Sequence, residues 1–201
     1  MGARVAVLAS GTGSNLQALL DDEVVGPAIG LVVSDRAEAK ALDRARSAGI
    51  EAVHLDPKAH ESREAHDRAL VDLLQDRGIE LVCLAGYMRI LSPGFVRAFW
   101  GKTLNVHPAL LPAFPGAHAV RDALSWGVKL TGCTVHVVDE EVDHGPILAQ
   151  EAVPVLDDDD EASLHARIQE AEHRLYPSVV RRLLDGRVRL DGRRVIVEEE
   201  S

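Results

Sequence analysis

Short apolar runs alternate with amphipathic stretches through the first half of the chain, and this alternation limits the fold more than any other feature. Each run is rich in Val, Ile, Leu or Ala, as buried parallel strands are. The runs cover residues 4–9, 29–33, 52–55, 81–85 and 103–106, and helices are expected between them at 15–20, 37–48, 61–77 and 93–100. The pattern predicts an α/β fold with an open Rossmann-like, mostly parallel sheet and helices on both faces.

The pattern changes after residue 106, where a loop rich in proline leads to a short predicted helix at 120–126. Two longer strands, at 130–138 and 147–155, follow with a short connection through Gly145-Pro146, so we expect an antiparallel pair. A long helix is expected over 162–184 because its apolar residues recur at helical spacing, and two small strands end the chain. The whole chain, 1–201, is predicted to form a single domain.

Charge and cysteine content narrow the class of protein. The formal net charge of −10 repels phosphate backbones at long range, which argues against nucleic acid as a partner. Cys83 and Cys133 lie in apolar runs and predict buried thiols rather than a disulfide or metal framework. No signal peptide and no apolar stretch of membrane-spanning length is recognisable. We therefore expect a soluble cytoplasmic protein without a membrane partner.

The segment 10–15, Ser-Gly-Thr-Gly-Ser-Asn, follows the first predicted strand and opens a helix. Glycines there let backbone N–H groups approach an anion, and a helix N-terminus favours negative charge. The dinucleotide fingerprint needs a third glycine where this chain has Leu16, so a single phosphate is a better ligand than a nicotinamide cofactor. The hydroxyls of Thr12 and Ser14 would add donors. A tight strand-to-helix turn with no ligand is the alternative.

Asn105 and His107 lie two residues apart at the end of a predicted strand, so extended geometry places both side chains on one face. Open α/β sheets bind ligands at the carboxyl ends of their strands. Asn105 could polarise a carbonyl while His107 donates or shuttles a proton. The alternative is a turn asparagine beside an exposed histidine, but the irregular loop that follows favours a functional interpretation.

Other polar residues are candidates of the same kind. Asp143, in an acidic segment, would raise the pKa of His107 if it came near, although the local sequence favours an acidic surface turn. His136 could be a core histidine. Glu172 lies on or beside the buried stripe of the long helix, where a carboxylate needs a partner such as a substrate amine, a hydroxyl or a structural arginine. Arg63 could be a plain surface cation.

Taken in order, these segments resemble one family. The matching residues are 10–18, 35–37, 62–64, 84–92, 105–112 and 143–146. They are similar to those of the phosphoribosylglycinamide formyltransferases, folate-dependent enzymes of purine biosynthesis. One departure is His144, where the family often has glycine.

The resemblance implies a role for each matching residue. Asn105, His107 and Asp143 match the catalytic trio of the family. In that reaction the amine attacks the formyl carbon directly, and a tetrahedral oxyanion forms. Residues that match the ribonucleotide site are Gly11, Thr12, Gly13, Ser14, Asn15 and Glu172. Residues that match positions near the folate are Arg63, Met88, Arg89, Ile90, Leu91 and Asn105.

The resemblance also implies the reactants and the layout of the chain. The formyl donor would be 10-formyltetrahydrofolate, with no metal and no tightly bound cofactor. Residues 1–100 would form a phosphate-binding Rossmann-like half and residues 101–201 a catalytic and folate-binding half. The partners would be small molecules, glycinamide ribonucleotide and the folate, and the protein would be a monomer or homodimer.

Four other functions remain open from the residues. Relatives in the same superfamily hydrolyse formyltetrahydrofolate or formylate methionyl-tRNA. The first tends to place a second histidine where this chain has Pro108, and the second carries an additional C-terminal nucleic-acid-binding domain. A third alternative is metal-dependent hydrolysis, with His107, His136, Asp143 and His144 as zinc ligands. A fourth is a phosphate-ligand sensor built on the glycine loop.

Overall fold

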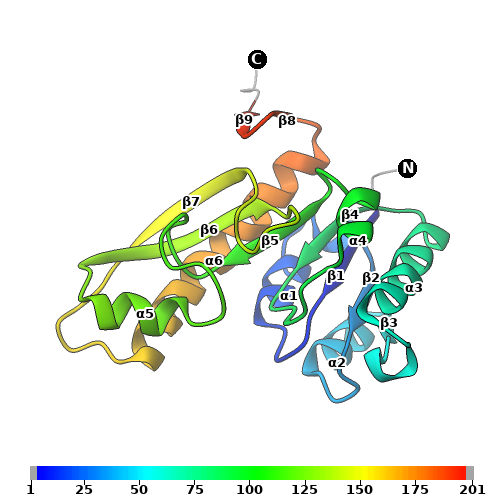
Figure 1. Cartoon of the computed structure of the whole chain (residues 1–201), viewed down its shortest axis with the longest axis horizontal. Helices are drawn as coiled ribbons and strands as arrows, with labels where there is room; N and C mark the ends of the chain where they lie inside the picture. Colours follow the sequence, from blue (N-terminus) through cyan, green and yellow to red (C-terminus); the bar gives the residue numbers. More distant parts are fainter. Residues whose placement is uncertain (1–3, 198–201) are drawn as a thin grey trace. The chain divides into compact units, whose positions relative to one another are not determined.

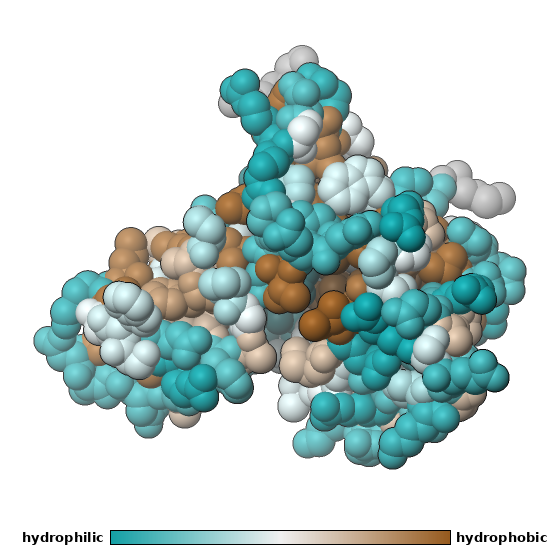
Figure 2. All heavy atoms as spheres, in the orientation of Figure 1, coloured by the Kyte–Doolittle hydropathy of each residue, from teal (hydrophilic) through white to brown (hydrophobic). Residues whose placement is uncertain are grey.

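A computed structural model describes residues 4–197 and shows strands and helices alternating as the sequence predicts (Figure 1). The chain forms two compact units, which divide between Leu104 and Asn105. Strand β5 (Thr103–His107) runs across this division. Hydrophilic side chains cover most of the face seen in Figure 2, in keeping with the high charge of the chain.

The first unit is a parallel sheet covered by helices. Its strands lie in the order β3-β2-β1-β4, and every neighbouring pair among them is parallel. They are β1 (Arg4–Leu8), β2 (Ile29–Ser34), β3 (Glu51–His54) and β4 (Ile79–Leu84). The chain builds the sheet outward from β1 through β2 to β3 and then returns to place β4 on the other side of β1. Because crossovers between parallel strands are right-handed, helices that precede this return and helices that accompany it lie on opposite faces.

The helices of this unit are α1 (Ser14–Leu20), α2 (Lys40–Ser47), α3 (Arg63–Asp76) and α4 (Pro93–Ala98), with short 3-10 turns η1 (Gly26–Ala28) and η2 (Pro57–Ala59). The helix expected from residue 37 begins only at Lys40, because the preceding residues form a turn in which Ala39 N–H donates to the Arg36 carbonyl. The helix expected to reach residue 100 ends at Ala98.

The second unit has the expected antiparallel pair and long helix. Strands β6 (Leu130–Val137) and β7 (Ile147–Pro154) pair antiparallel, with Thr134 opposite Gln150. Helix α6 (Glu161–Leu184) packs on this pair through Leu164 and Ile168, which join Cys133 in one buried cluster. Its remaining elements within the described residues are α5 (Ala119–Trp126) and the hairpin β8 (Val188–Asp191) and β9 (Arg194–Val197).

Local signals explain where α6 begins. The Asp160 carboxylate accepts from the N–H of Ser163 at 2.8 Å, and the Ser163 hydroxyl accepts from the Asp160 N–H at 3.0 Å. This reciprocal cap satisfies donors that the first turn would leave without partners. The acidic run 157–160 thus ends at the residue that caps α6, where negative charge also stabilises the helix N-terminus.

Both cysteines are fully buried free thiols, as predicted. Among residues 4–197, no helical stretch combines the length and the hydropathy that crossing a bilayer requires.

Candidate active site

Two predicted site residues, Asn105 and His107, lie within the last three residues of β5. Asn105 is half-buried and His107 is 4% exposed, and the extended strand puts both side chains on the same face, as expected. The next segment leaves the strand and forms the proline-containing loop 108–116. This places the two side chains at the carboxyl end of a strand, where α/β folds place their ligands.

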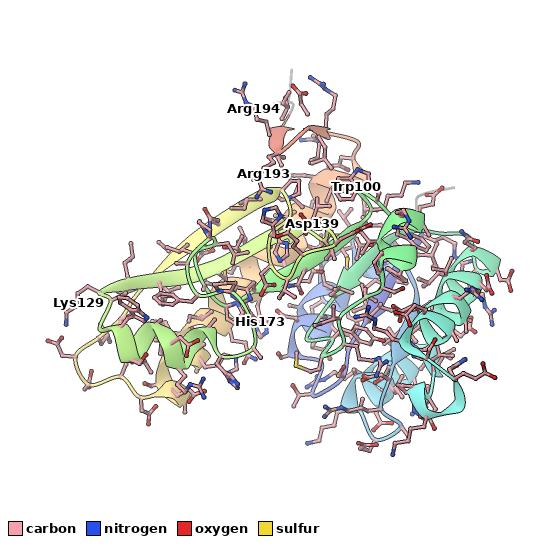
Figure 3. The ribbon with its side chains drawn as sticks, in the orientation of Figure 1. Trp100, Lys129, Asp139, His173, Arg193 and Arg194 are labelled. Atoms are coloured by element: carbon pink, nitrogen blue, oxygen red, sulfur yellow. The ribbon has the colours of Figure 1, made fainter. Side chains whose placement is uncertain are left out.

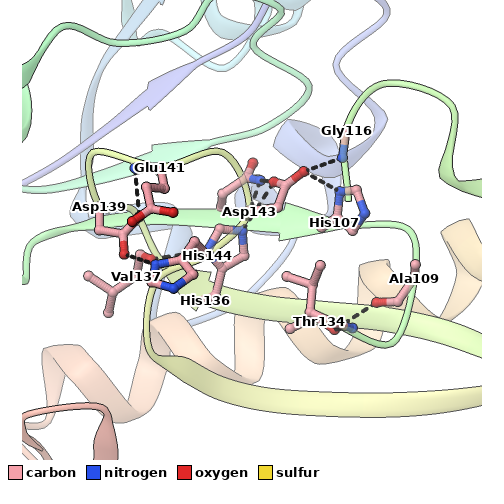
Figure 4. A network of polar contacts seen from close by, with 12 residues as sticks. His107, Ala109, Gly116, Thr134, His136, Val137, Asp139, Glu141, Asp143 and His144 are labelled. Atoms are coloured by element: carbon pink, nitrogen blue, oxygen red, sulfur yellow. Dashed lines mark hydrogen bonds and ion pairs between the residues drawn. The ribbon is translucent and has the colours of Figure 1, made fainter. Parts of the chain in front are cut away.

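Asp143 reaches this pair across 38 residues of sequence from Asn105. Figure 4 shows its contacts with His107 and Gly116. Its Oδ2 accepts from the Gly116 N–H at 2.8 Å and lies 3.3 Å from His107 Nδ1. Its Oδ1 lies 3.4 Å from the Asn105 amide nitrogen and 3.6 Å from His136 Nε2. Both oxygens of one carboxylate therefore face nitrogen atoms, so the group is held in a defined orientation.

The backbone at Asp143 is in the left-handed region, with φ of 52°. Aspartate and asparagine tolerate this conformation better than most residues, but it remains uncommon for any side chain other than glycine. Strained backbone of this kind persists where surrounding contacts hold it, and here the contact with the Gly116 N–H does so.

The two ionisable partners influence each other's pKa in opposition to burial. Burial lowers the pKa of His107 below 6.5, although the Asp143 charge and the Phe114 carbonyl act to raise it. For Asp143 burial acts to raise the pKa, but interactions with His136, with the Gly116 N–H and with His107 outweigh it and keep the pKa below 3.8. The sequence anticipated that Asp143 would raise the pKa of His107; the structure shows that burial has the larger effect.

Hydrogen bonding restricts the tautomer of His107. Its Nε2 lies 2.8 Å from the Phe114 carbonyl oxygen, which can only accept, so Nε2 carries a proton. Its Nδ1 faces the Asp143 carboxylate at 3.3 Å. A second proton on Nδ1 would satisfy both acceptors, so this environment is suited to a ring that gains and loses a proton.

His136 belongs to the same cluster and is buried, as expected of a core histidine. It is 2% exposed on β6, and its Nδ1 lies 3.0 Å from the Val137 carbonyl. Its Nε2 lies 3.2 Å from the Asn105 amide nitrogen and 3.6 Å from Asp143 Oδ1. His136 therefore contacts both the amide and the carboxylate of the cluster. Its alternation with Thr134 was the only signal in the sequence, and it did not identify the contact.

Side chains from β6 and β7 anchor the loop 108–116. The Thr134 hydroxyl donates to the Ala109 carbonyl at 2.6 Å and accepts from the Leu111 N–H at 3.0 Å. The Gln150 amide donates to the Leu111 carbonyl at 2.9 Å. These bonds fix the loop that supplies the Phe114 carbonyl to His107 and the Gly116 N–H to Asp143.

His144 makes its own contacts at the position where the chain departs from the resemblance. The ring Nδ1 of this exposed residue lies 2.8 Å from Asp139 Oδ2. Arg193, on the hairpin of β8 and β9, donates to the His144 backbone carbonyl at 2.6 Å. Asp139 and Arg193 are labelled in Figure 3. The departure therefore adds the contact between the ring and Asp139 to the loop directly after Asp143, whereas the carbonyl that Arg193 contacts would be present with glycine as well.

In the first unit, the glycine loop follows β1 and opens α1. Gly13 has φ of 72°, and a Cβ there would lie 2.9 Å from Ala41 Cα, so only glycine fits without strain. Arg44 of α2 donates to the Thr12 carbonyl at 2.9 Å and to the Gln17 side chain at 2.8 Å. The Arg44 guanidinium therefore holds the backbone of the glycine loop at Thr12.

Of the residues matched to the folate, Asn105 belongs to the second unit, and the others lie in two places within the first unit. Arg63 is the first residue of α3 and lines a cavity of about 510 Å³ together with Arg68 and Arg97. The segment 88–91 alternates between exposed Met88 and Ile90, half-buried Arg89 and buried Leu91.

Glu172 is 4% exposed on α6, in the second unit. Burial raises the pKa of the nearby Cys133 thiol to about 12, and the Glu172 charge adds to this shift. Residues 4–197 contain no group of three or more His, Cys, Asp or Glu side chains arranged to hold a metal ion. The polar atoms of His107, His136 and Asp143 are instead engaged with one another or with backbone groups.

Comparison with known proteins shows the family of the chain. A formyl transferase family profile matches residues 3–180. The phosphoribosylglycinamide formyltransferase of Mycobacterium tuberculosis is 50% identical over 95% of this chain and 89% of that relative. The trifunctional purine biosynthetic protein adenosine-3 of Bos taurus is 46% identical over 98% of this chain, which spans only 20% of that longer relative.

The structural comparison supports the same assignment. The crystal structure of glycinamide ribonucleotide transformylase 1 from Symbiobacterium toebii superposes with a TM-score of 0.96 at 50% identity, covering 98% of this chain and 95% of that one. This likeness confirms the predicted α/β, Rossmann-like fold. The chain belongs to the formyl transferase family and, within it, to the phosphoribosylglycinamide formyltransferases.

Proposed function

We propose that this chain transfers the formyl group of 10-formyltetrahydrofolate to the amine of phosphoribosylglycinamide, a step of purine biosynthesis, with Asn105, His107 and Asp143 as its catalytic residues. The observation that carries the proposal is the contact of Asp143 with both other residues at the carboxyl end of β5, in a chain of this family. An amide, an imidazole and a carboxylate in mutual contact suit the chemistry of acyl transfer.

The reaction begins when the amine of the ribonucleotide attacks the formyl carbon, forming a new C–N bond and an oxyanion. In this structure the Asn105 amide donates to Asp143, and both ring nitrogens of His107 face acceptors. When substrate binds, an N–H group of each residue turns to the oxyanion and stabilises its charge by donating a hydrogen bond. The C–N bond to the folate nitrogen then breaks, and a proton passes from the attacking amine to the leaving nitrogen. Burial makes protonated His107 a readier proton donor, while the Asp143 charge keeps that protonated form accessible.

The substrates are assigned to further residues by the same proposal. Residues 11–15 bind the ribonucleotide phosphate, because glycines and hydroxyl side chains at the start of a helix present N–H and O–H donors. Glu172 meets the polar groups of the glycinamide. The folate contacts Arg63, the segment 88–91 and Asn105, and the three arginines of the 510 Å³ cavity suit the carboxylates of a folate tail.

The wider setting follows from the family and the composition. We propose one formyltransferase domain, with a phosphate-binding half over 1–100 and a catalytic and folate-binding half over 101–201. The chain would act in the cytoplasm on small molecules, as a monomer or homodimer, with no tightly bound cofactor or metal. Its net charge of −10 disfavours nucleic acid as a partner.

The test is to mix the protein with phosphoribosylglycinamide and 10-formyltetrahydrofolate and follow loss of the formyl group from the folate. We expect turnover only when the ribonucleotide is present. Equal turnover without it would identify a hydrolase that passes the formyl group to water. His107→Ala should lower kcat by about 100-fold or more, while the ribonucleotide still binds. His165→Ala, at an exposed position of α6, is the matched control and should keep kcat.

A further inference from the structure

Ser10 lies between the two binding elements of the first unit and contacts both. It follows β1, opens the glycine loop and is only 2% exposed. Its N–H donates to the Gly86 carbonyl at 3.0 Å, and its hydroxyl oxygen accepts from the Met88 N–H at 2.9 Å. The first residue of the glycine loop is thereby bonded twice to the segment that carries residues 88–91.

Asp35 determines how the Ser10 hydroxyl is oriented. The hydroxyl has one hydrogen, and it lies 2.6 Å from Asp35 Oδ1. An ionised carboxylate only accepts, so the hydrogen points at Asp35 and the lone pairs of the oxygen remain for Met88. The charge on Asp35 also makes this the stronger kind of hydrogen bond. The orientation required to receive the Met88 N–H is therefore built into the pair.

The segment 85–92 contains no helix or strand and includes Gly86 at φ of 72°. Its first residue is held by the Ala85 N–H, which donates to the Leu8 carbonyl at 2.8 Å. Its far end is held by the buried Asp67 carboxylate, which accepts from the Ser92 N–H at 2.5 Å. Side-chain acceptors at Met88 and at Ser92 thus replace ladder bonds that regular structure would supply.

We propose that Ser10, oriented by Asp35, is a positioning residue that sets the backbone of residues 86–90 for the folate. The inference rests on the proposed function, because that segment is the assigned folate site. Ser10 would touch neither reacting group. It would act by holding the backbone so that Met88 and Ile90, which are 65% and 59% exposed, stay in a fixed position.

Three variants test the inference against one control. Ser10→Ala removes the acceptor for the Met88 N–H, and loss of one such bond is worth about tenfold in an equilibrium constant. We expect KM for 10-formyltetrahydrofolate to rise about tenfold, with kcat changed less than threefold. Asp35→Asn keeps an amide oxygen for the hydroxyl and should preserve KM. Asp35→Ala leaves the hydroxyl free to rotate and should raise KM in the same direction by a smaller factor.

Thr103→Val is the matched control, because it removes another buried hydroxyl of the first unit, one that donates to the Phe99 carbonyl at 3.3 Å. It should leave the folate KM unchanged. Hydrogen exchange of the Met88 amide gives a readout that does not depend on activity. Exchange should quicken at least about tenfold in Ser10→Ala and stay slow in Thr103→Val.

The outcomes separate the two proposals. Raised folate KM together with faster Met88 exchange in Ser10→Ala supports the inference. An active wild type in which Ser10→Ala leaves either the folate KM or the Met88 exchange unchanged overturns it. A rise in KM of the same size in Thr103→Val would also overturn it, since any buried hydroxyl would then serve. A wild type with no transfer activity would reject the proposed function instead.

Discussion

Replacing Asp143 with asparagine tests the central contact most directly. Asparagine has nearly the same shape and tolerates the left-handed backbone at this position, so the change is confined to one oxygen and one charge. One oxygen of Asp143 accepts from the Gly116 N–H and the other faces the Asn105 amide. Whichever way the new amide turns, its NH₂ group meets an N–H donor.

We expect Asp143→Asn to have two effects, one on the stability of the fold and one on kcat. A buried donor left without an acceptor costs about 1–3 kcal/mol of stability. In a domain of this length each kcal/mol lowers Tm by about 2–4 °C. For catalysis, the variant loses the charge that acts to raise the pKa of His107. Loss of one preorganised electrostatic contribution of this kind lowers kcat by about 100-fold or more, or roughly 2.7 kcal/mol.

The assay is steady-state formyl transfer with both substrates, combined with thermal unfolding of the same preparations. Asp139→Asn, in the same loop, is the control, because Asp139 contacts the Glu141 N–H and His144 rather than His107. It should keep kcat within about threefold, because the contacts of Asp139 lie outside the group of Asn105, His107 and Asp143. A kcat for Asp143→Asn within the same threefold of wild type, in folded protein, would refute the role given to the carboxylate.

Three further expectations come from the loop and from the buried ionisable pair. Arg44→Ala should raise KM for the ribonucleotide about tenfold by freeing the glycine loop, with Arg46→Ala on the same helix as an unaffected control. Gly13→Ala should lower the free energy of unfolding by about 1–2 kcal/mol in urea titrations, because its backbone is left-handed. The fold lowers the pKa of both His107 and Asp143, so the unfolded chain takes up each proton first as pH falls. The urea concentration at the unfolding midpoint should therefore decrease as the pH is lowered below 6.5, and decrease again as it is lowered below 3.8. A midpoint that rises on acidification contradicts the two pKa shifts.

The order of strands and helices was predictable because each is encoded in a short window. The apolar runs that became β1, β2 and β4 are buried on both faces and carry no polar alternation, which is typical of parallel strands. Boundaries were less certain, as the late start of α2 shows, because the turn before it depends on one backbone hydrogen bond.

Part of the candidate site was also local. Asn105 and His107 share a face because a strand repeats every two residues, and the glycine loop can be identified from six consecutive residues. The sequence by itself determined these placements, since each depends only on neighbours along the chain. Their catalytic and binding roles stay predictions until the variants are measured.

The tertiary structure decided the rest. Contact of Asp143 with His107 depends on how the loop after β6 returns to β5, and no local pattern encodes that path. The place of His136 beside Asn105 and the sign of the His107 pKa shift depend on burial by residues distant in sequence. Desolvation and hydrogen bonding are properties of the packed environment, so they become defined only when the chain has folded.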